Sequence, residues 1–200
     1  PTTTYTGSWD NGVPDTSKKA IFNSNYNTST ADIDTCSCEV GNNATVTVAA
    51  GDYMKVEGNI TVASGASLVV AHEGSIVQVD DDATVTNNGT ITVEKTSPSI
   101  GNRGFMIVSS PMTLDDKTAF GNPIQFRNHL TGNFIPNPDV ANAFPGANNF
   151  ADDNGDNWQQ YNGMMNVGEG YLMMPQTTPT IGSPASYDFE FDQGTLNNGV

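Results

Sequence analysis

The chain has 200 residues and is strongly acidic, with 22 Asp and Glu against 7 Lys and Arg and a formal net charge of −15 at pH 7. This balance argues against nucleic-acid binding and against docking on anionic lipid, because both need clustered Lys and Arg side chains. No apolar run approaches the roughly 20 residues that a membrane span requires, so we expect no membrane span.

Asn, Asp, Gly and Thr are abundant, whereas Lys and Glu are scarce. Such a composition favours turns and strands over helices. It is typical of an extracellular or cell-surface protein. The chain starts at Pro1 without a signal peptide, so a mature secreted chain whose targeting segment has been removed and a cytosolic chain are both open. The composition favours the secreted chain.

Residues 1–19 are predicted to form an N-terminal cap. Trp9 is followed by turn-forming residues at 10–12 and 14–15. A stack of strands must cover its first open edge, or that edge would pair with other chains. We therefore expect Trp9 to cover the first coil of the repeat that follows.

A sequence repeat of about 22 residues occupies the region from residue 20 to residue 95. Residues 44–48 (ATVTV), 66–70 (ASLVV) and 89–93 (GTITV) align at steps of 22 and 23 residues. Two further alignments keep nearly the same spacing. In the first, Met54 aligns with Ile76 or Val77. In the second, Val40 aligns with Val62 and Val85, and the neighbouring inward positions are Cys38, Ile60 and Ala83. Three short strands per period, each apolar at alternate positions, indicate a coil with three faces.

One such coil cannot bury its own apolar side, whereas stacked coils bury a continuous apolar column. The repeat therefore predicts a three-sided parallel β-solenoid over residues 1–97. Val46, Leu68 and Ile91 should lie one above another in its interior.

Cys36 and Cys38 form a Cys-x-Cys pair within the first coil. Three interpretations are open: two buried thiols in the solenoid column, a strained disulfide, or part of a metal site. Buried thiols are favoured, because Cys38 aligns with Ile60, and no further Cys and no nearby His supports a metal site.

Residues 98–200 lack the 22-residue period and are predicted to form an antiparallel β-sandwich-like domain. Its expected strands lie within residues 103–111, 168–175 and 186–192, and residues 115–165 are expected to be dominated by loops. The ending Asn197-Asn198-Gly199-Val200 resembles the start of a further strand, so we interpret this domain as truncated at its C-terminus.

Several phrases, in this order, resemble the large secreted, adhesin-like cell-surface proteins of Bacteroidota that are exported by the type IX secretion system. The phrases are residues 9–14 with 20–22 and 26–28, residues 64–68 and 86–91, residues 105–111 followed by 168–172, and residues 194–199. The resemblance implies a multi-domain surface protein, and it supplies no catalytic residues. No sorting domain is visible, which agrees with a truncated chain.

A candidate calcium loop lies at Asp152, Asn154 and Asp156, which alternate as the first ligands of a calcium-binding loop do. A helix–loop–helix site is excluded, because Asn157 replaces the required Gly and Gly163 replaces the bidentate Glu. A looser extracellular Ca²⁺ loop and a solvated acidic turn are both open. Residues 80–82 (DDD) form a second acidic cluster, which we interpret as a solvated corner of the solenoid.

Trp158, Tyr161 and Tyr171 form a candidate sugar-stacking platform, because flat aromatic rings cover the apolar faces of pyranose rings. The alternative is that these rings pack in the core. Outward threonines such as Thr45, Thr47, Thr90 and Thr92 also raise an ice-binding hypothesis, which Ser67 and Val69 interrupt in the coil between.

No nucleophile–base spacing, phosphate-binding loop or dinucleotide motif occurs, and we expect no enzyme. The leading hypothesis is a structural or adhesive module, in which a rigid solenoid presents a loop-rich domain. The alternative is a Ca²⁺-assisted carbohydrate-binding module. Expected partners are an extracellular surface, a glycan, or other copies of the chain in a larger assembly.

Overall fold

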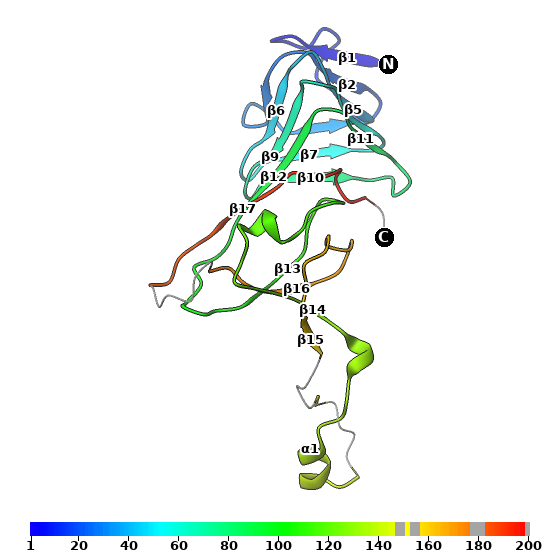
Figure 1. Cartoon of the computed structure of the whole chain (residues 1–200). Coiled ribbons are helices and arrows are strands. Elements are labelled where there is room, and N and C mark those ends of the chain that lie inside the picture. Colours follow the sequence, from blue (N-terminus) through cyan, green and yellow to red (C-terminus); the bar gives the residue numbers. More distant parts are fainter. Residues whose placement is uncertain (147–150, 153–156, 177–182, 199–200) are drawn as a thin grey trace.

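The computed structural model describes residues 1–146, 151–152, 157–176 and 183–198. The protein is all-β, with a three-sided parallel solenoid followed by an antiparallel sheet (Figure 1). The predicted fold class is confirmed.

The solenoid has three sides, which the chain visits in the order side 1, side 2, side 3. Side 1 holds β1 (Thr2–Tyr5), β2 (Lys19–Phe22), β5 (Ser37–Val40), β8 (Ile60–Val62) and β11 (Val85–Asn87). Side 2 holds β3 (Tyr26–Asn27), β6 (Thr45–Val48), β9 (Ser67–Val70) and β12 (Thr90–Thr96). Side 3 holds β4 (Ile33–Thr35), β7 (Tyr53–Val56) and β10 (Ser75–Gln78).

The C-terminal sheet is antiparallel and has the strand order β13-β16-β14-β15. Its strands are β13 (Met106–Val108), β14 (Gln125–His129), β15 (Trp158–Gln160) and β16 (Tyr171–Met174). The helical segments are η1 (Lys117–Phe120), η2 (Thr131–Asn133) and α1 (Pro138–Ala143). None of these helices is long and apolar enough to cross a membrane within the described part of the chain.

The interior of the solenoid consists of columns of stacked apolar side chains. On side 2, Val46 pairs with Leu68, and Leu68 pairs with Ile91, in a parallel register. All three side chains are completely buried. The predicted column is therefore confirmed, and on side 3 the residue beneath Met54 is Ile76 rather than Val77.

The predicted register on side 1 is wrong in the last coil. Val85 pairs with Ile60, and Asn87 pairs with Val62, whereas Ala83 precedes the strand. The corner between Gln78 and Val85 holds three more residues than the corresponding corner one coil earlier. The next corner, between Asn87 and Thr90, is two residues shorter than its counterpart one coil earlier. The length of the whole repeat therefore changes by only one residue, and the altered register on side 1 is not visible in the sequence.

The N-terminal end of the solenoid is capped by aromatic rings, as predicted for Trp9. The Trp9 ring lies 5.3 Å from Phe22 and 5.9 Å from Tyr26, centroid to centroid. Tyr5 completes the cluster at 5.2 Å from Trp9. These rings cover the first coil, because Tyr5 lies above Phe22 on side 1 and Tyr26 begins the column of side 2.

The outer edge of β1 is satisfied by the turn that follows it, through backbone and side-chain groups, instead of by another strand. The Thr4 N–H donates to Asp10 Oδ1 at 2.7 Å, and the Asn11 Nδ2 donates to the Thr2 carbonyl at 2.9 Å. The hydrogen bond from the Thr4 backbone lowers the pKa of Asp10 below its ordinary value. A neighbouring chain therefore finds this edge already occupied.

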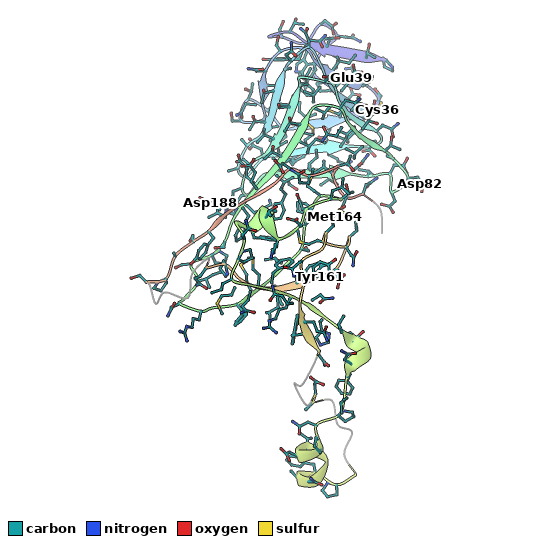
Figure 2. The ribbon with its side chains drawn as sticks, viewed as in Figure 1. Cys36, Glu39, Asp82, Tyr161, Met164 and Asp188 are labelled. Atoms are coloured by element: carbon teal, nitrogen blue, oxygen red, sulfur yellow. The ribbon has the colours of Figure 1, made fainter. Side chains whose placement is uncertain are left out.

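Both cysteines are free thiols, so the disulfide alternative is wrong. Cys38 is buried in the side 1 column beside Ile60, and burial raises the pKa of its thiol to about 12. Cys36 is only half-buried and lies in the bend between β4 and β5, at the side of the solenoid in Figure 2. The interpretation as buried thiols is therefore confirmed for Cys38 alone.

The C-terminal part is joined to the solenoid by β17 (Asp188–Phe191). This strand pairs antiparallel with β12, placing Phe191 opposite Val93 and Phe189 opposite Lys95. We predicted the strand within residues 186–192 as part of a separate sandwich-like domain, but it extends side 2 of the solenoid instead. The described residues of the C-terminal part form one sheet packed beneath the solenoid (Figure 1).

Replacing Leu68 with Ala should reduce the free energy of unfolding by about 2–5 kcal/mol, because the cavity would lie in the centre of a close-packed column. The matched control is Val69→Ala, since Val69 is the neighbouring residue of β9 and faces outward. Urea unfolding followed by circular dichroism measures both. Equal destabilisation by the two substitutions would contradict the stacked-column arrangement.

Candidate functional site

A buried carboxylate fastens the C-terminal part together beneath the solenoid. Asp115 accepts a hydrogen bond from Ser110 Oγ at 2.6 Å and another from the Gln193 N–H at 3.1 Å. Its backbone carbonyl accepts from the Met165 N–H at 2.8 Å. One residue thus ties together three segments that are distant in sequence, and its burial raises the pKa of its carboxyl.

Aromatic side chains continue the core from the solenoid into the C-terminal sheet. The Phe120 ring lies 5.1 Å from Phe189 and 5.3 Å from Phe191, both of which belong to β17. On its other side Phe120 contacts Phe126, and Phe126 stacks on Tyr171 with an interplanar angle of 9°. The C-terminal sheet is therefore packed against the lower end of the solenoid, which we call the floor.

An apolar cleft of about 360 Å³ opens along this junction. Met106, Val108, Phe120, Phe189 and Phe191 form most of its wall, and Lys95 lies at its margin. Such a cleft can accept an apolar group, but hydrogen-bonding side chains that would orient a substrate contribute little of its wall.

A long projection, which we call the arm, leaves the sheet between β14 and β15. The described part of the arm comprises residues 130–146, 151–152 and 157, and in Figure 1 it extends away from the solenoid with α1 near its tip. We expected residues 115–165 to be dominated by loops. The structure adds β14 and β15, which form the two-stranded base of the arm through the pairing of His129 with Trp158.

The two legs of the arm are joined by hydrogen bonds along its length. At the base, the Leu130 N–H donates to the Asn157 carbonyl at 2.7 Å. Further out, the Asn137 N–H donates to the Ala151 carbonyl at 2.9 Å. The Asn137 side chain also accepts from the Asp139 N–H and so caps α1.

The arm carries exposed apolar side chains. Phe134 and Ile135 are exposed on one leg, and Phe144, just beyond α1, is 64% exposed. Water contact with large apolar side chains on a projection far from the core is unfavourable and is typical of a contact surface. The arm is therefore the candidate functional site.

The calcium hypothesis falls largely outside the described residues. Asp152 is described: its Oδ1 accepts from the Ile135 N–H at 3.3 Å, so the carboxylate helps to join the legs of the arm. Asn154 and Asp156 lie outside the described residues. Among the residues that the structure does describe, no group of three His, Cys, Asp or Glu could hold a metal ion.

The acidic residues 80–82 lie at a solenoid corner, and Figure 2 shows Asp82 at the periphery of the molecule. The backbone of this corner binds the C-terminal segment. Asn198 Nδ2 donates to the Asp80 carbonyl at 3.0 Å and to the Ala83 carbonyl at 2.8 Å. The Asp81 and Asp82 side chains are exposed, as expected for a solvated corner.

The predicted aromatic platform of Trp158, Tyr161 and Tyr171 is not assembled. Tyr171 is completely buried, with its hydroxyl donating to Glu169 Oε2 at 3.0 Å, and burial raises its pKa. Tyr161 packs against Tyr171 at 5.0 Å and contributes to the core. The prediction is therefore wrong for Tyr171, because alternate residues of β16 face the interior of the domain.

Trp158 alone of the three remains available, with 37% of its surface exposed. Its ring meets His129 edge to face at 4.8 Å, and its carbonyl accepts from Arg127 Nη1 at 3.0 Å. Arg127 Nε is in turn fixed by Gln125 Oε1 at 3.0 Å. No sequence pattern pointed to Arg127 or His129, because their position depends on the pairing of β14 with β15.

Replacing Asp115 with Asn should reduce the free energy of unfolding by about 1–3 kcal/mol, because the amide nitrogen of Asn cannot accept one of the two hydrogen bonds that the Asp115 oxygens accept. The raised pKa means that the folded state binds the proton more tightly than the unfolded chain. The contribution of Asp115 therefore falls as the pH rises above about 4. Urea unfolding between pH 4 and pH 7 should show a difference from wild type that shrinks with pH, whereas a growing difference would contradict this assignment. Asp81→Asn, at an exposed carboxylate distant in sequence from Asp115, is the control.

Comparison with curated proteins and with solved structures finds no match. A family model described as a domain of unknown function (DUF8693) matches residues 4–200, from the N-terminal cap to the segment that closes the solenoid floor. The chain therefore belongs to the DUF8693 family.

Proposed function

We propose that the protein is a non-enzymatic structural or adhesive module, secreted or on the cell surface. In this proposal the solenoid is a rigid spacer, and the C-terminal sheet with its arm is the contact surface. The expected partner is an extracellular surface or a glycan, or other copies of the chain in a larger assembly.

The observation that carries the proposal is the position of the arm. It projects from the end of the molecule opposite the N-terminal cap (Figure 1) and exposes Phe134, Ile135 and Phe144. Binding residues are often found on loops that a rigid scaffold positions. A projection with an apolar end can reach a partner that the flat sides of the solenoid cannot.

The rigidity of the scaffold supports the same proposal. Side 2 is an unbroken ladder from β3 to β17, so it continues from the first coil into the C-terminal part. Phe120 then connects β17 to the sheet that bears the arm. Force applied to the arm is thus transmitted to the solenoid through backbone hydrogen bonds and packed rings.

The double substitution Phe134→Ser/Phe144→Ser should abolish surface attachment without unfolding the protein, because both side chains are exposed. Attachment can be measured as mass deposited on sensor surfaces coated with mucin, cellulose or chitin. We expect a reduction of about ten-fold or more on any surface that the wild type binds. Val13→Ser, at an exposed apolar residue near the opposite end, is the matched control.

Two results would count against the adhesive proposal. One is the absence of wild-type deposition on all three surfaces. The other is an equal reduction by Val13→Ser, which would indicate nonspecific apolar adsorption.

Ca²⁺-assisted carbohydrate binding is a second candidate function, and the exposure of Trp158 beside Arg127 and His129 favours it. A ring half open to solvent can stack on a sugar, while the guanidinium and imidazole can donate to hydroxyls. The site is smaller than the sequence indicated, since Tyr171 is buried.

Trp158→Ala should weaken glycan binding by about five- to ten-fold, the loss expected for one aromatic stacking contact. A glycan array read with and without a chelator measures both the aromatic and the calcium contributions. Met174→Ala, on the same strand as Tyr171 but half-buried, is the control. Unchanged binding by Trp158→Ala would exclude this candidate.

A further inference from the structure

The floor of the solenoid presents one strand edge from each of its three sides. The edge of side 2 is covered by β17, which pairs with β12. On side 1 the C-terminal segment contacts the last strand, since Asn87 Nδ2 donates to the Gly194 carbonyl at 2.9 Å, although no strand among the described residues pairs with the lower edge of β11. On side 3, no strand among the described residues pairs with β10 on the edge away from β7.

Within the part of the chain that the structure describes, the backbone of β10 has no hydrogen-bond partner along this edge. The Ser75 N–H donates upward to the Asp52 carbonyl at 3.0 Å, and the Val79 N–H donates upward to Val56 at 2.9 Å. Because successive residues of a strand point their backbone groups in opposite directions, those of Ile76 and Gln78 point toward the floor. Such a row of groups is a template for another strand.

The side chains of β10 also show that the last coil is only partly covered. Ile33 and Met54, the inward residues above it on side 3, are completely buried, whereas Ile76 is only half-buried. On the outer surface, Val77 is 46% exposed and Val79 is 44% exposed.

A cavity of about 360 Å³ lies directly beside this edge, large enough to accept one large side chain. Its wall includes Ile76 and Gln78 from β10 and, from the C-terminal part, Pro111, Val167, Leu196 and Asn197. Asn197 Oδ1 is buried there, and none of the described residues donates a hydrogen bond to it. A strand bound to β10 could place an apolar side chain in the cavity and donate to this oxygen.

The acidic residues around the lower edge of β10 favour a partner strand with basic residues. Glu73 precedes β10, and the acidic residues 80–82 follow it. No Lys or Arg occurs between Lys55 and Lys95 or after Arg127, and Lys55 is paired with Glu57 at 2.7 Å. A partner with basic residues flanking its apolar segment complements this field.

A second copy of the chain fits this edge poorly. Antiparallel pairing of two β10 strands would bring Glu73 of one copy near residues 80–82 of the other, and each copy has a net charge of −15. Like charges across such a contact oppose association.

We propose that the lower edge of β10 is a docking site for an extended basic segment of another protein, which adds a fourth strand to side 3 and places one apolar side chain in the floor cavity. This form of recognition obtains affinity from main-chain hydrogen bonds and specificity from a pocket for alternate side chains. The site is independent of the arm, so its failure and that of the adhesive proposal are distinguishable.

The probe is a fluorescent peptide of alternating threonine and valine flanked by two lysines at each end. Anisotropy titration should give saturable binding to the wild type that weakens as salt is raised. The same peptide with glutamates in place of the lysines should bind about ten-fold or more weakly. Hydrogen exchange should show new protection of the Ile76 and Gln78 amides in the complex, because the Ser75 and Val79 amides already donate to the coil above.

Val77→Lys should weaken binding of the lysine peptide by about ten-fold or more, because a cation on β10 repels the basic probe and opposes strand pairing. The matched control is Val69→Lys on β9, whose two edges are both paired. Asp81→Asn/Asp82→Asn should weaken binding by a few fold and flatten its salt dependence. Circular dichroism verifies that each variant is folded.

Absence of saturable binding by the wild type would overturn the proposal. So would equal binding of the two peptides, or equal effects of Val77→Lys and Val69→Lys. A dimer in sedimentation that Val77→Lys dissociates would overturn it in favour of a second copy of the chain.

Discussion

The structure depends on one constraint, the parallel register that places each inward residue directly on the inward residue of the preceding coil. Val46, Leu68 and Ile91 satisfy it on side 2, and Ile33, Met54 and Ile76 satisfy it on side 3. Because the backbone hydrogen bonds run between coils, a strand that slips by one residue loses its buried face. The corners absorb differences in length, so an insertion at one corner leaves the columns intact when the next corner shortens.

Sequence alone could predict the solenoid, because the constraint leaves apolar residues at a fixed spacing in residues 44–93. It could not predict the register of Val85 and Asn87, since a lengthened corner followed by a shortened one preserves the overall period. The base of the arm was missed for another reason. The strands β14 and β15 are rich in polar side chains, and only their pairing reveals which residues face outward. The alternation of apolar and polar residues in 186–192 identified the strand containing Phe189 and Phe191, but it could not identify the sheet to which that strand belongs.

The two ends of the solenoid are closed in different ways. At the N-terminal end, Asp10 and Asn11 satisfy the backbone of β1, and four aromatic rings cover the first coil. At the floor, the chain returns after about a hundred residues to add β17 and to bind the corner at residues 80–82 through Asn198. Hydrogen bonds from the adjacent turn and aromatic rings close the first end, whereas at the floor β17 pairs with side 2 and the C-terminal segment contacts side 1.

The distribution of charge limits which strands can pair with the lower edge of β10 on side 3. All seven basic residues lie at or before Arg127, so the segments that close the floor and form most of the arm contribute acidic side chains without basic ones. An open strand edge usually endangers a protein, because identical chains can pair through it. Here the acidic residues beside β10 oppose such pairing while leaving its backbone groups accessible. The same charges that keep copies apart would attract a basic strand, so one electrostatic feature both protects the edge and determines what it can bind.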